Sequence, residues 1–248
     1  MTAAHAILLG LIIPAYLLGS VPFGLIVART RGIDPRKAGS GNIGVTNVGR
    51  LLGGKFFAIV FTLDLFKGLV PMIAAGLVLR LFVGDPHSYR PADYGLWLLV
   101  GFAAIAGHMF SVFLGFKGGK GVATSTGVIL GLFPYYTLPA GIAVLAFLVL
   151  FIATRYVSVS SMIGSIIFVL AYLGIGLALR WPVFGSQWPL LAFAVLMAAL
   201  IVYKHRGNLA RLRAGTEQRI GSEPRAEQKK TRRQDAEIAK ESTTGRGA

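Results

Sequence analysis

Long apolar stretches alternate with short charged clusters along most of the chain. Apolar runs of roughly 18 to 25 residues can cross a hydrocarbon layer about 30 Å thick as helices. The pattern therefore predicts an all-α, polytopic integral membrane protein with about seven transmembrane helices. The fourth and fifth helices are short and lie close to Pro134 and Pro139, so they could instead be tilted, re-entrant or partly fused. The expected spans cover residues 5–28, 54–82, 94–115, 121–138, 139–154, 159–180 and 188–204.

The two ends of the chain require separate interpretations. The first apolar run is too long for a typical signal-peptide core, and no Lys or Arg precedes it, so we expect a retained span. After Gly221 the sequence is hydrophilic and offers almost no apolar residues for a core. We expect a single transmembrane domain over residues 1–217 and a basic, polar, disordered cytoplasmic tail over residues 218–248. Electrostatic docking of the tail to lipid headgroups is the alternative.

Composition narrows the class of protein. Apolar residues make up 54% of the chain and charged residues only 14%, a combination typical of integral membrane proteins. Cysteine is absent, so disulfides, a thiol nucleophile and sulfur ligands for zinc are excluded. The net charge of +15 suggests nucleic acid at first sight. Because the cations lie between apolar runs, topology and attraction to anionic lipid explain them better, and we expect no nucleic acid partner.

The cations also predict the orientation. They cluster after the first, third, fifth and seventh spans, whereas the opposite loops carry only Arg80, Arg90 and Arg180. Loops rich in Lys and Arg tend to stay cytoplasmic. We therefore expect the N-terminus outside and the C-terminus in the cytoplasm.

Residues 37–50 form the first predicted cytoplasmic loop, in which small hydroxyl and amide side chains alternate with glycines. Backbone N–H groups of such a loop can approach an anion, and an Arg side chain can pair with phosphate in a bidentate fashion. The alternative is a flexible loop of turn-forming residues with topology-setting cations. The candidate phosphate ligands are Ser40, Gly41, Asn42, Thr46, Asn47 and Arg50.

A second glycine-rich loop precedes the fourth span. This loop places backbone donors and two cations at a predicted helix N-terminus, where an anion is bound favourably. The candidate ligands are Lys117, Gly118, Gly119 and Lys120. This is not a nucleotide-binding P-loop, because Gly121 stands where that motif requires Ser or Thr. A nucleoside triphosphatase is therefore disfavoured.

Two further cytoplasmic segments carry candidate catalytic side chains. Ser158 follows a cation at the start of the sixth span, where capping of the helix is its alternative role. His205 and Asn208 are three residues apart, so they share one face if the helix continues. Histidine exchanges protons near neutral pH, although an isolated interfacial His often has no catalytic role.

Ionisable residues inside predicted spans are costly and therefore informative. Asp64 and Lys67 are three residues apart in the second span and can neutralise each other on a helix. We prefer this pairing, and a proton or ion path is the competing hypothesis. For His108 in the third span we expect packing against polar neighbours.

These motifs, in this order, resemble the acyl-phosphate-dependent glycerol 3-phosphate acyltransferase family (PlsY). The resemblance extends over about residues 10–217. Two positions depart from the family pattern: Ser111 replaces a proline, and Val45 replaces the usual alanine. Because Ser111 is not a proline, the bend at the end of the third span is not predicted. The matching strings are residues 19–24, 39–48, 64–68, 116–124, 155–158 and 205–208.

The resemblance implies a seven-span enzyme of the bacterial plasma (inner) membrane. It implies that residues 1–217 are catalytic and move a fatty acyl group from acyl phosphate to the 1-hydroxyl of sn-glycerol 3-phosphate. The products are lysophosphatidic acid and phosphate, in the first acylation of phospholipid synthesis, and no metal, other cofactor or coenzyme A takes part. By position, phosphate groups would be held by Ser40, Thr46, Arg50 and Lys120. The glycerol phosphate would be oriented by Ser158, His205 and Asn208.

Physical reasoning favours direct attack by the glycerol hydroxyl. Phosphate is a good leaving group, so the protein mainly has to hold two anions together and stabilise developing charge. The proton would pass to His205 or to a substrate phosphate. A serine acyl-enzyme is less attractive because the Gly-x-Ser-x-Gly motif is missing. The alternative function is a membrane transporter for an anionic phosphorylated metabolite, which would place polar groups near the middle of the membrane.

Overall fold

The computed structural model describes residues 2–80 and 89–220, and in these residues all regular structure is helical. The helices are α1 (Ala3–Ser20), α2 (Phe23–Arg29), α3 (Val45–Leu52), α4 (Gly54–Val78), α5 (Pro91–Met109), the 3-10 helix η2 (Val112–Leu114), α6 (Val122–Gly131), α7 (Thr137–Thr154), α8 (Val157–Ala178), α9 (Trp188–Lys204) and α10 (Arg206–Arg213).

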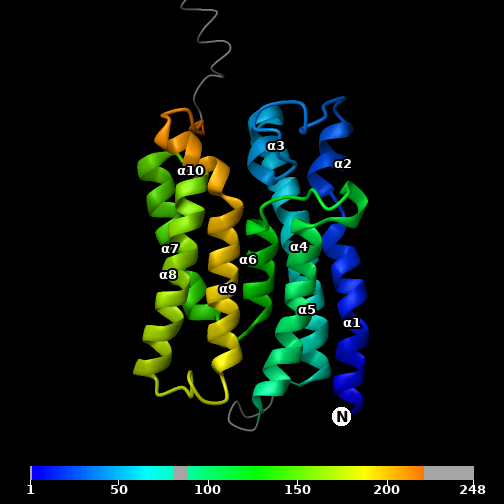
Figure 1. Ribbon diagram of the computed structural model, residues 1–248, viewed down its shortest axis with the longest axis vertical. Coiled ribbons are helices and arrows are strands. Elements are labelled where there is room, and N and C mark those ends of the chain that lie inside the picture. Colours follow the sequence, from blue (N-terminus) through cyan, green and yellow to red (C-terminus); the bar gives the residue numbers. More distant parts are fainter. Residues whose placement is uncertain (1, 81–88, 221–248) are drawn as a thin grey trace, which may run out of the picture.

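The long helices lie side by side and form an upright bundle (Figure 1). Successive long helices run in opposite directions, and the N-terminus lies at the lower end of the bundle. The short helices α2, α3 and α10 gather at the upper end together with the loop before α6. All four segments that the sequence predicts to carry phosphate-binding or catalytic residues therefore lie at one end.

The helices confirm an all-α membrane protein, with a difference in the spans. In the described residues, five segments are long and apolar enough to cross a membrane, and a sixth qualifies if α9 and α10, bent by 50°, count as one span. In the expected fourth span, 121–138, the helix α6 has only 10 residues, and α7 already begins at Thr137. At 1.5 Å per residue α6 is about 15 Å long, roughly half the hydrocarbon thickness.

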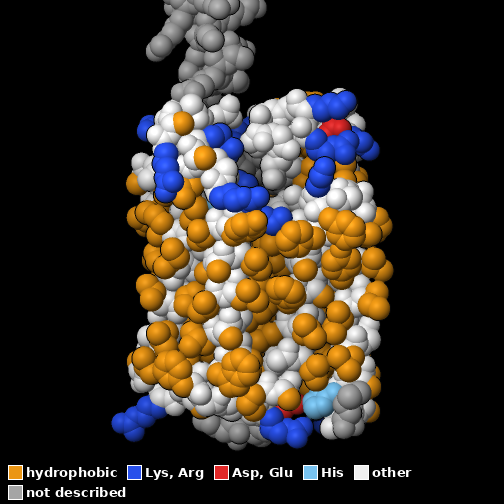
Figure 2. All heavy atoms as spheres, in the orientation of Figure 1, with side chains coloured by type: hydrophobic (Ala, Val, Ile, Leu, Met, Phe, Trp, Pro, Cys, Tyr) orange, Lys and Arg blue, Asp and Glu red, His pale blue; other side chains and the backbone are white. Residues whose placement is uncertain are grey.

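Apolar side chains cover the sides of the bundle between its two ends (Figure 2). Ile13, Leu145 and Ile152 are 68%, 64% and 72% exposed, respectively. Large contiguous apolar surface is unusual on a soluble protein. A bundle with this surface is suited to a surrounding lipid layer.

Glycines let two helix pairs approach closely. Between α1 and α5, a Cβ added to Gly19 would lie 2.1 Å from the Ala104 carbonyl oxygen. Between α4 and α6, a Cβ added to Gly127 would lie 1.9 Å from the Leu65 carbonyl oxygen. Small residues at such crossings are typical of membrane helices. The α4–α6 contact places the start of α6, and the loop before it, beside α4.

Asp64 and Lys67 form the buried ion pair that the sequence predicts. Their side chains are 3% and 2% exposed, and Lys67 Nζ lies 2.8 Å from Asp64 Oδ1. Lys67 Nζ also donates a hydrogen bond to the Val21 carbonyl oxygen at 3.0 Å. The pair therefore also supplies a donor to the break between α1 and α2, where backbone carbonyls lose their helical partners.

Ser111 contacts the same break. Its hydroxyl donates to the Ser20 carbonyl oxygen at 2.6 Å. Its φ of −62° is also a proline value, so the backbone here suits either residue. The end of the third predicted span is now defined, because α5 ends at Met109 and η2 begins at Val112.

Candidate functional site

A cavity opens at the end of the bundle where α3 and α10 lie, and Lys and Arg side chains surround a recess there (Figure 2). It contains about 800 Å³ of empty space, including its open mouth. Segments far apart in the sequence contribute to its wall. The predicted site residues that line it are Ser40, Asn42, Thr46, Asn47, Arg50, Lys120, Ser158, His205 and Asn208.

Three residues of the second glycine-rich loop lie outside the cavity lining. The Lys117 side chain is exposed. The Gly118 and Gly119 N–H groups donate to the carbonyl oxygens of Met109 and His108 at 3.2 and 3.0 Å. A Cβ on Gly118 or Gly119 would lie 2.0 or 2.2 Å from a His108 atom. These glycines therefore let the loop pack against the end of α5, and their N–H groups are already used.

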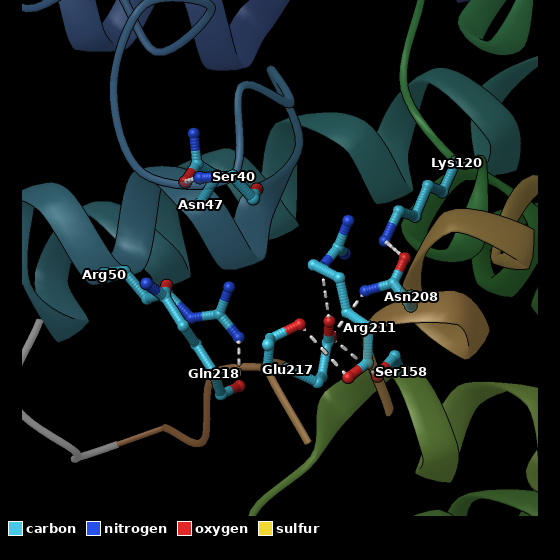
Figure 3. Close-up of polar contacts among 10 residues, drawn as sticks. Ser40, Asn47, Arg50, Lys120, Ser158, Asn208, Arg211, Glu217 and Gln218 are labelled. Atoms are coloured by element: carbon cyan, nitrogen blue, oxygen red, sulfur yellow. Dashed lines mark hydrogen bonds and ion pairs between the residues drawn. The ribbon is translucent and has the colours of Figure 1, made fainter. Parts of the chain in front are cut away.

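Asn47 organises the first loop from inside. Its side chain is buried, and its Oδ1 accepts a hydrogen bond from the Ser40 N–H at 2.8 Å. Its Nδ2 lies 2.9, 3.1 and 2.8 Å from the carbonyl oxygens of Pro35, Ala38 and Asn42. Asn47 thus holds Ser40 at the cavity wall, beside α3 (Figure 3).

The same loop leads into α3 through a turn. Gly41 has φ of +71°, a value that glycine adopts readily, and it is not part of the cavity lining. Asn42 Oδ1 accepts from the N–H of Gly44, the N-cap of α3, at 2.8 Å. Thr46 follows in the first turn of α3, where helix N–H groups lack helical partners. The end of α3 that favours anions therefore borders the cavity.

Arg50 lies in the last turn of α3 and points toward the C-terminal segment (Figure 3). Its Nη2 donates to the Gln218 carbonyl oxygen at 2.8 Å. Its Nε is buried and has no hydrogen-bond partner within the described part of the chain. Burial lowers the pKa of Arg50, Glu217 raises it, and Arg211 lowers it further. A buried guanidinium donor without a partner is suited to a phosphate oxygen.

Lys120 reaches the cavity from the loop before α6. Its Nζ donates a short hydrogen bond to Asn208 Oδ1. The pKa of Lys120 is lowered to about 8, mainly by burial; Glu217 raises it, and Arg211 and Arg50 lower it. Lys120 is thus a cation whose charge depends on its neighbours near neutral pH.

His205 lies at the bend between α9 and α10, and it is 2% exposed. Its Nδ1 is 2.7 Å from the Ile201 carbonyl oxygen. Because a carbonyl oxygen can only accept, Nδ1 carries the proton of this bond. In the neutral ring the lone pair therefore lies on Nε2, which can accept a proton from a bound ligand.

Glu217 is a site residue that the sequence analysis missed. Its side chain is 3% exposed, and it lies among donors from α8 and α10 (Figure 3). Oε1 accepts from Asn208 Nδ2 at 2.6 Å and from Ser158 Oγ at 3.0 Å, and Oε2 accepts from Arg211 Nε at 2.7 Å. Burial raises the pKa of Glu217, but hydrogen bonds from these three side chains outweigh burial and lower it.

A signal for Glu217 was present in the sequence. It is the first acidic residue after Asp93, and it lies shortly after the basic helix α10, which ends at Arg213. An isolated carboxylate beside many cations is a natural partner for them. Its position at the boundary with the polar tail makes this signal weak. Arg211 and Ser161, whose hydroxyl is buried without a partner in the described residues, were also not selected.

The cavity also has an apolar wall. Phe57 and Phe61 of α4 line it with their rings stacked at 6.2 Å, and Phe147 of α7 and Val157 of α8 complete it. A cavity with charged groups and an apolar wall suits a ligand that has both characters. In residues 2–80 and 89–220, no three His, Asp or Glu side chains gather where they could hold a metal ion.

The chain is similar to known proteins of one family. The family model described as glycerol-3-phosphate acyltransferase matches residues 9–215. A glycerol-3-phosphate acyltransferase of Thermus thermophilus is 45% identical over 212 residues, covering 84% of this chain and 92% of the relative. One from Aquifex aeolicus is 41% identical over 212 residues, covering 85% and 97%.

A solved structure is also similar. The crystal structure of PlsY, an integral membrane glycerol 3-phosphate acyltransferase, in its glycerol 3-phosphate form has a TM-score of 0.72 and 39% identity. The match covers 86% of this chain and 96% of that one. Residues 9–215 include every segment that contributes a predicted residue to the cavity. The chain therefore belongs to the glycerol-3-phosphate acyltransferase family.

Proposed function

We propose that this protein transfers a fatty acyl group from acyl phosphate to the 1-hydroxyl of sn-glycerol 3-phosphate, giving lysophosphatidic acid and phosphate. The observation that carries the proposal is the gathering of cations and small polar groups from four separate segments around one cavity. The relatives are glycerol-3-phosphate acyltransferases by name, and two similar crystal structures are the glycerol 3-phosphate form and the lysophosphatidic acid form of PlsY.

Phosphate binding is assigned to the side chains on either side of the cavity. Arg50 and Lys120 provide charge, and Ser40 and Thr46 provide hydroxyl donors. Both substrates are anions, so these cations also offset the repulsion between them. Holding two reactants in contact removes much of the entropic barrier to transfer.

The reaction is direct attack by the glycerol oxygen. A bond forms between O1 of glycerol 3-phosphate and the acyl carbonyl carbon, and the bond between that carbon and the phosphate oxygen breaks. His205 Nε2 accepts the hydroxyl proton and returns it to the leaving phosphate, which departs as hydrogen phosphate. Lys120 stabilises the charge that develops on the departing phosphate. Ser158 and Asn208 orient the glycerol hydroxyl groups.

The acyl chain is assigned to the apolar wall. Phe57, Phe61 and Phe147 lie on helices whose outer faces carry exposed apolar side chains. A chain lying along this wall stays in contact with the surrounding lipid, from which an amphipathic donor would arrive. This arrangement favours an acyl phosphate, a small anionic headgroup on a lipid tail, over a donor attached to a large soluble carrier.

We place the protein in the bacterial inner membrane, with the cavity end and the C-terminus in the cytoplasm. The support is the excess of Lys and Arg at that end. A transporter would place its polar groups near the middle of the membrane. The polar groups of the cavity gather at one end of the bundle, which does not favour that alternative.

A donor comparison tests the proposal. Purified protein is given glycerol 3-phosphate with acyl phosphate, acyl coenzyme A or acyl carrier protein, and the products are identified by mass. We expect lysophosphatidic acid from acyl phosphate alone. Product from either carrier-bound donor at an equal rate would contradict the assigned donor, and a covalent acyl-protein intermediate would contradict direct attack.

A further inference from the structure

We propose that Glu217 is a positioning residue of the active site: its carboxylate holds Ser158 and Asn208 in the orientation in which they meet glycerol 3-phosphate. The proposal rests on the function proposed above. It extends the site beyond the residues selected from the sequence, to the segment that follows α10.

Backbone hydrogen bonds fix where this segment lies. The N–H groups of Thr216 and Glu217 both donate to the Arg211 carbonyl oxygen, at 2.7 and 3.2 Å. The Ile220 N–H donates to the carbonyl oxygen of Arg155, between α7 and α8, at 3.0 Å. The segment therefore folds back over α10 and is held from two sides, which carries the Glu217 side chain into the cavity wall.

Glu217 decides the orientation of the Asn208 amide. Asn208 Oδ1 accepts from Lys120 Nζ, and Asn208 Nδ2 donates to Glu217 Oε1 at 2.6 Å. If the amide turned over, its NH₂ group would face the Lys120 ammonium group, and two donors would oppose each other. The carboxylate and the ammonium group thus select one of the two amide orientations.

Glu217 also decides how Ser158 can contact a substrate. The Ser158 hydroxyl donates its proton to Glu217 Oε1 at 3.0 Å. With its proton used in this bond, the Ser158 oxygen can only accept from other groups. A glycerol hydroxyl is a suitable donor, so Ser158 is set to orient the glycerol part of the substrate.

The carboxylate charge has a second effect, on Lys120. The charged groups facing Lys120 are Arg50 on α3, Arg211 on α10 and Glu217, and His205 lies at the α9–α10 bend. Of the three charged groups, Glu217 alone has a charge that raises the pKa of Lys120. Loss of the Glu217 charge therefore makes Lys120 easier to deprotonate.

The remaining ionisable groups at the cavity do not share this role. Asp64 and His108 lie at the cavity wall on α4 and α5. Asp64 is committed to Lys67 at 2.8 Å, and His108 Nδ1 lies 3.8 Å from Asp64 Oδ1. Glu217 is therefore the carboxylate of the described chain that lies among the proposed substrate-binding cations.

The test compares Glu217→Gln with Asp34→Asn, which removes a carboxylate from the exposed loop before Ser40, outside the cavity lining. We expect kcat of Glu217→Gln to fall about ten- to hundredfold, the loss associated with hydrogen bonds to a charged group. We also expect the alkaline midpoint of its kcat/KM profile for glycerol 3-phosphate to move to lower pH. Asp34→Asn should keep the wild-type kcat and midpoint.

These readouts separate positioning from folding. A variant that is partly unfolded loses rate in proportion to the inactive fraction, but its KM and its midpoint belong to the folded fraction. A normal midpoint with a lower kcat would therefore overturn the proposal, as would wild-type values for both quantities. A lower KM with an unchanged or higher kcat would also overturn it, because the carboxylate would then be competing with the substrate phosphate.

Failure of the proposed donor is distinguishable from failure of this proposal. Binding of glycerol 3-phosphate alone is measured by calorimetry across the same pH range for the three proteins. If acyl phosphate is not the donor, the wild type makes no product from it, yet the shift in binding midpoint for Glu217→Gln is still expected. An unshifted binding midpoint overturns the role of Glu217 whichever donor is correct.

Discussion

The two ends of the bundle use charge in different ways. At the lower end, His5 Nε2 lies 2.7 Å from Asp93 Oδ1, and Arg90 Nε lies 3.8 Å from Asp93 Oδ2. At the cavity end, Glu217 makes its carboxylate contact with Arg211, while Lys120 and Arg50 bond to neutral oxygens. The Asp93 carboxylate at the lower end has basic side chains as partners, whereas Lys120 and Arg50 at the cavity end stay available to an anion.

A third group of charges lies between these ends. Asp64 and Lys67 are both buried in α4 and neutralise each other. The role of a charged side chain therefore depends on its partner and not on its position in the bundle. A buried cation with a carboxylate partner stabilises the fold, and a buried cation without one is available for substrate.

The largest expected effect is on stability, from Lys67→Ala. It leaves the Asp64 carboxylate buried without its cation and removes a donor from the Val21 carbonyl oxygen. Breaking a buried pair in this way costs about 3–5 kcal/mol. Thermal unfolding in detergent should show a much lower midpoint, whereas Lys55→Ala, at an exposed position on the same helix, should not. Equal midpoints for the two variants would contradict the role of the pair.

Lys120→Ala should instead impair activity while the protein remains folded. Removal of one group that stabilises developing charge lowers the rate about 100- to 1000-fold. Arg50→Ala should act in the same direction. The matched variant is Lys117→Ala, which removes an exposed ammonium group outside the cavity lining, and we expect its loss in kcat/KM to be much smaller. Similar losses of kcat/KM in Lys117→Ala and Lys120→Ala would mean that the total positive charge of this end, and not the cavity, attracts the substrate.

The pH dependence of kcat/KM should reflect the titration of Lys120. Below its pKa of about 8 Lys120 is protonated and attracts phosphate, and above that value the charge is lost. We therefore expect kcat/KM to fall as pH rises through about 8, by about tenfold per further pH unit. Lys120→Arg should remove this decline, because the guanidinium group stays charged. A decline that persists unchanged in Lys120→Arg would assign it to another group.

The smallest expected effect is at the lower end. His5→Ala removes one hydrogen bond to Asp93, which keeps its bond from the Arg90 N–H, and one such bond contributes about 1 kcal/mol. The unfolding midpoint should fall slightly, and kcat/KM should remain at the wild-type value. A large loss of activity would show that the two ends are coupled.

Much of the candidate site was predictable because its residues carry a local signal. Glycines beside hydroxyl and amide side chains indicated the loop before α3, and apolar runs indicated the helices and the end at which the loops meet. The transmembrane fold follows from the same runs, since a lipid layer leaves a helix as the simplest way to satisfy the backbone. Of the tail expected over residues 218–248, only 218–220 are described: the Gln218 carbonyl oxygen accepts from Arg50, and the Ile220 N–H donates to the Arg155 carbonyl oxygen. Residues 221–248 lie outside the described residues.

Other features had no local signal. The pattern predicted a short fourth span over residues 121–138, with a re-entrant segment as an alternative. The helix α6 ends at Gly131, and its close packing on α4 through Gly127 is a tertiary contact. Gly118 and Gly119 resemble phosphate ligands in sequence, yet their N–H groups bond to carbonyl oxygens at the end of α5. Which carbonyl oxygen a loop N–H meets depends on how the chain folds back on α5 after η2, and the glycine pattern does not show that fold-back.

The amino-acid sequence by itself determined the helical class, the end of the bundle that carries positive charge and most of the polar residues in the cavity. These depend on hydropathy, charge and spacing, which are properties of short segments. Only the tertiary structure decided that Glu217 joins Ser158, Asn208 and Arg211, and that Lys120 has its pKa lowered to about 8. Both depend on distances between segments and on exclusion of water, and neither quantity exists until the helices have packed.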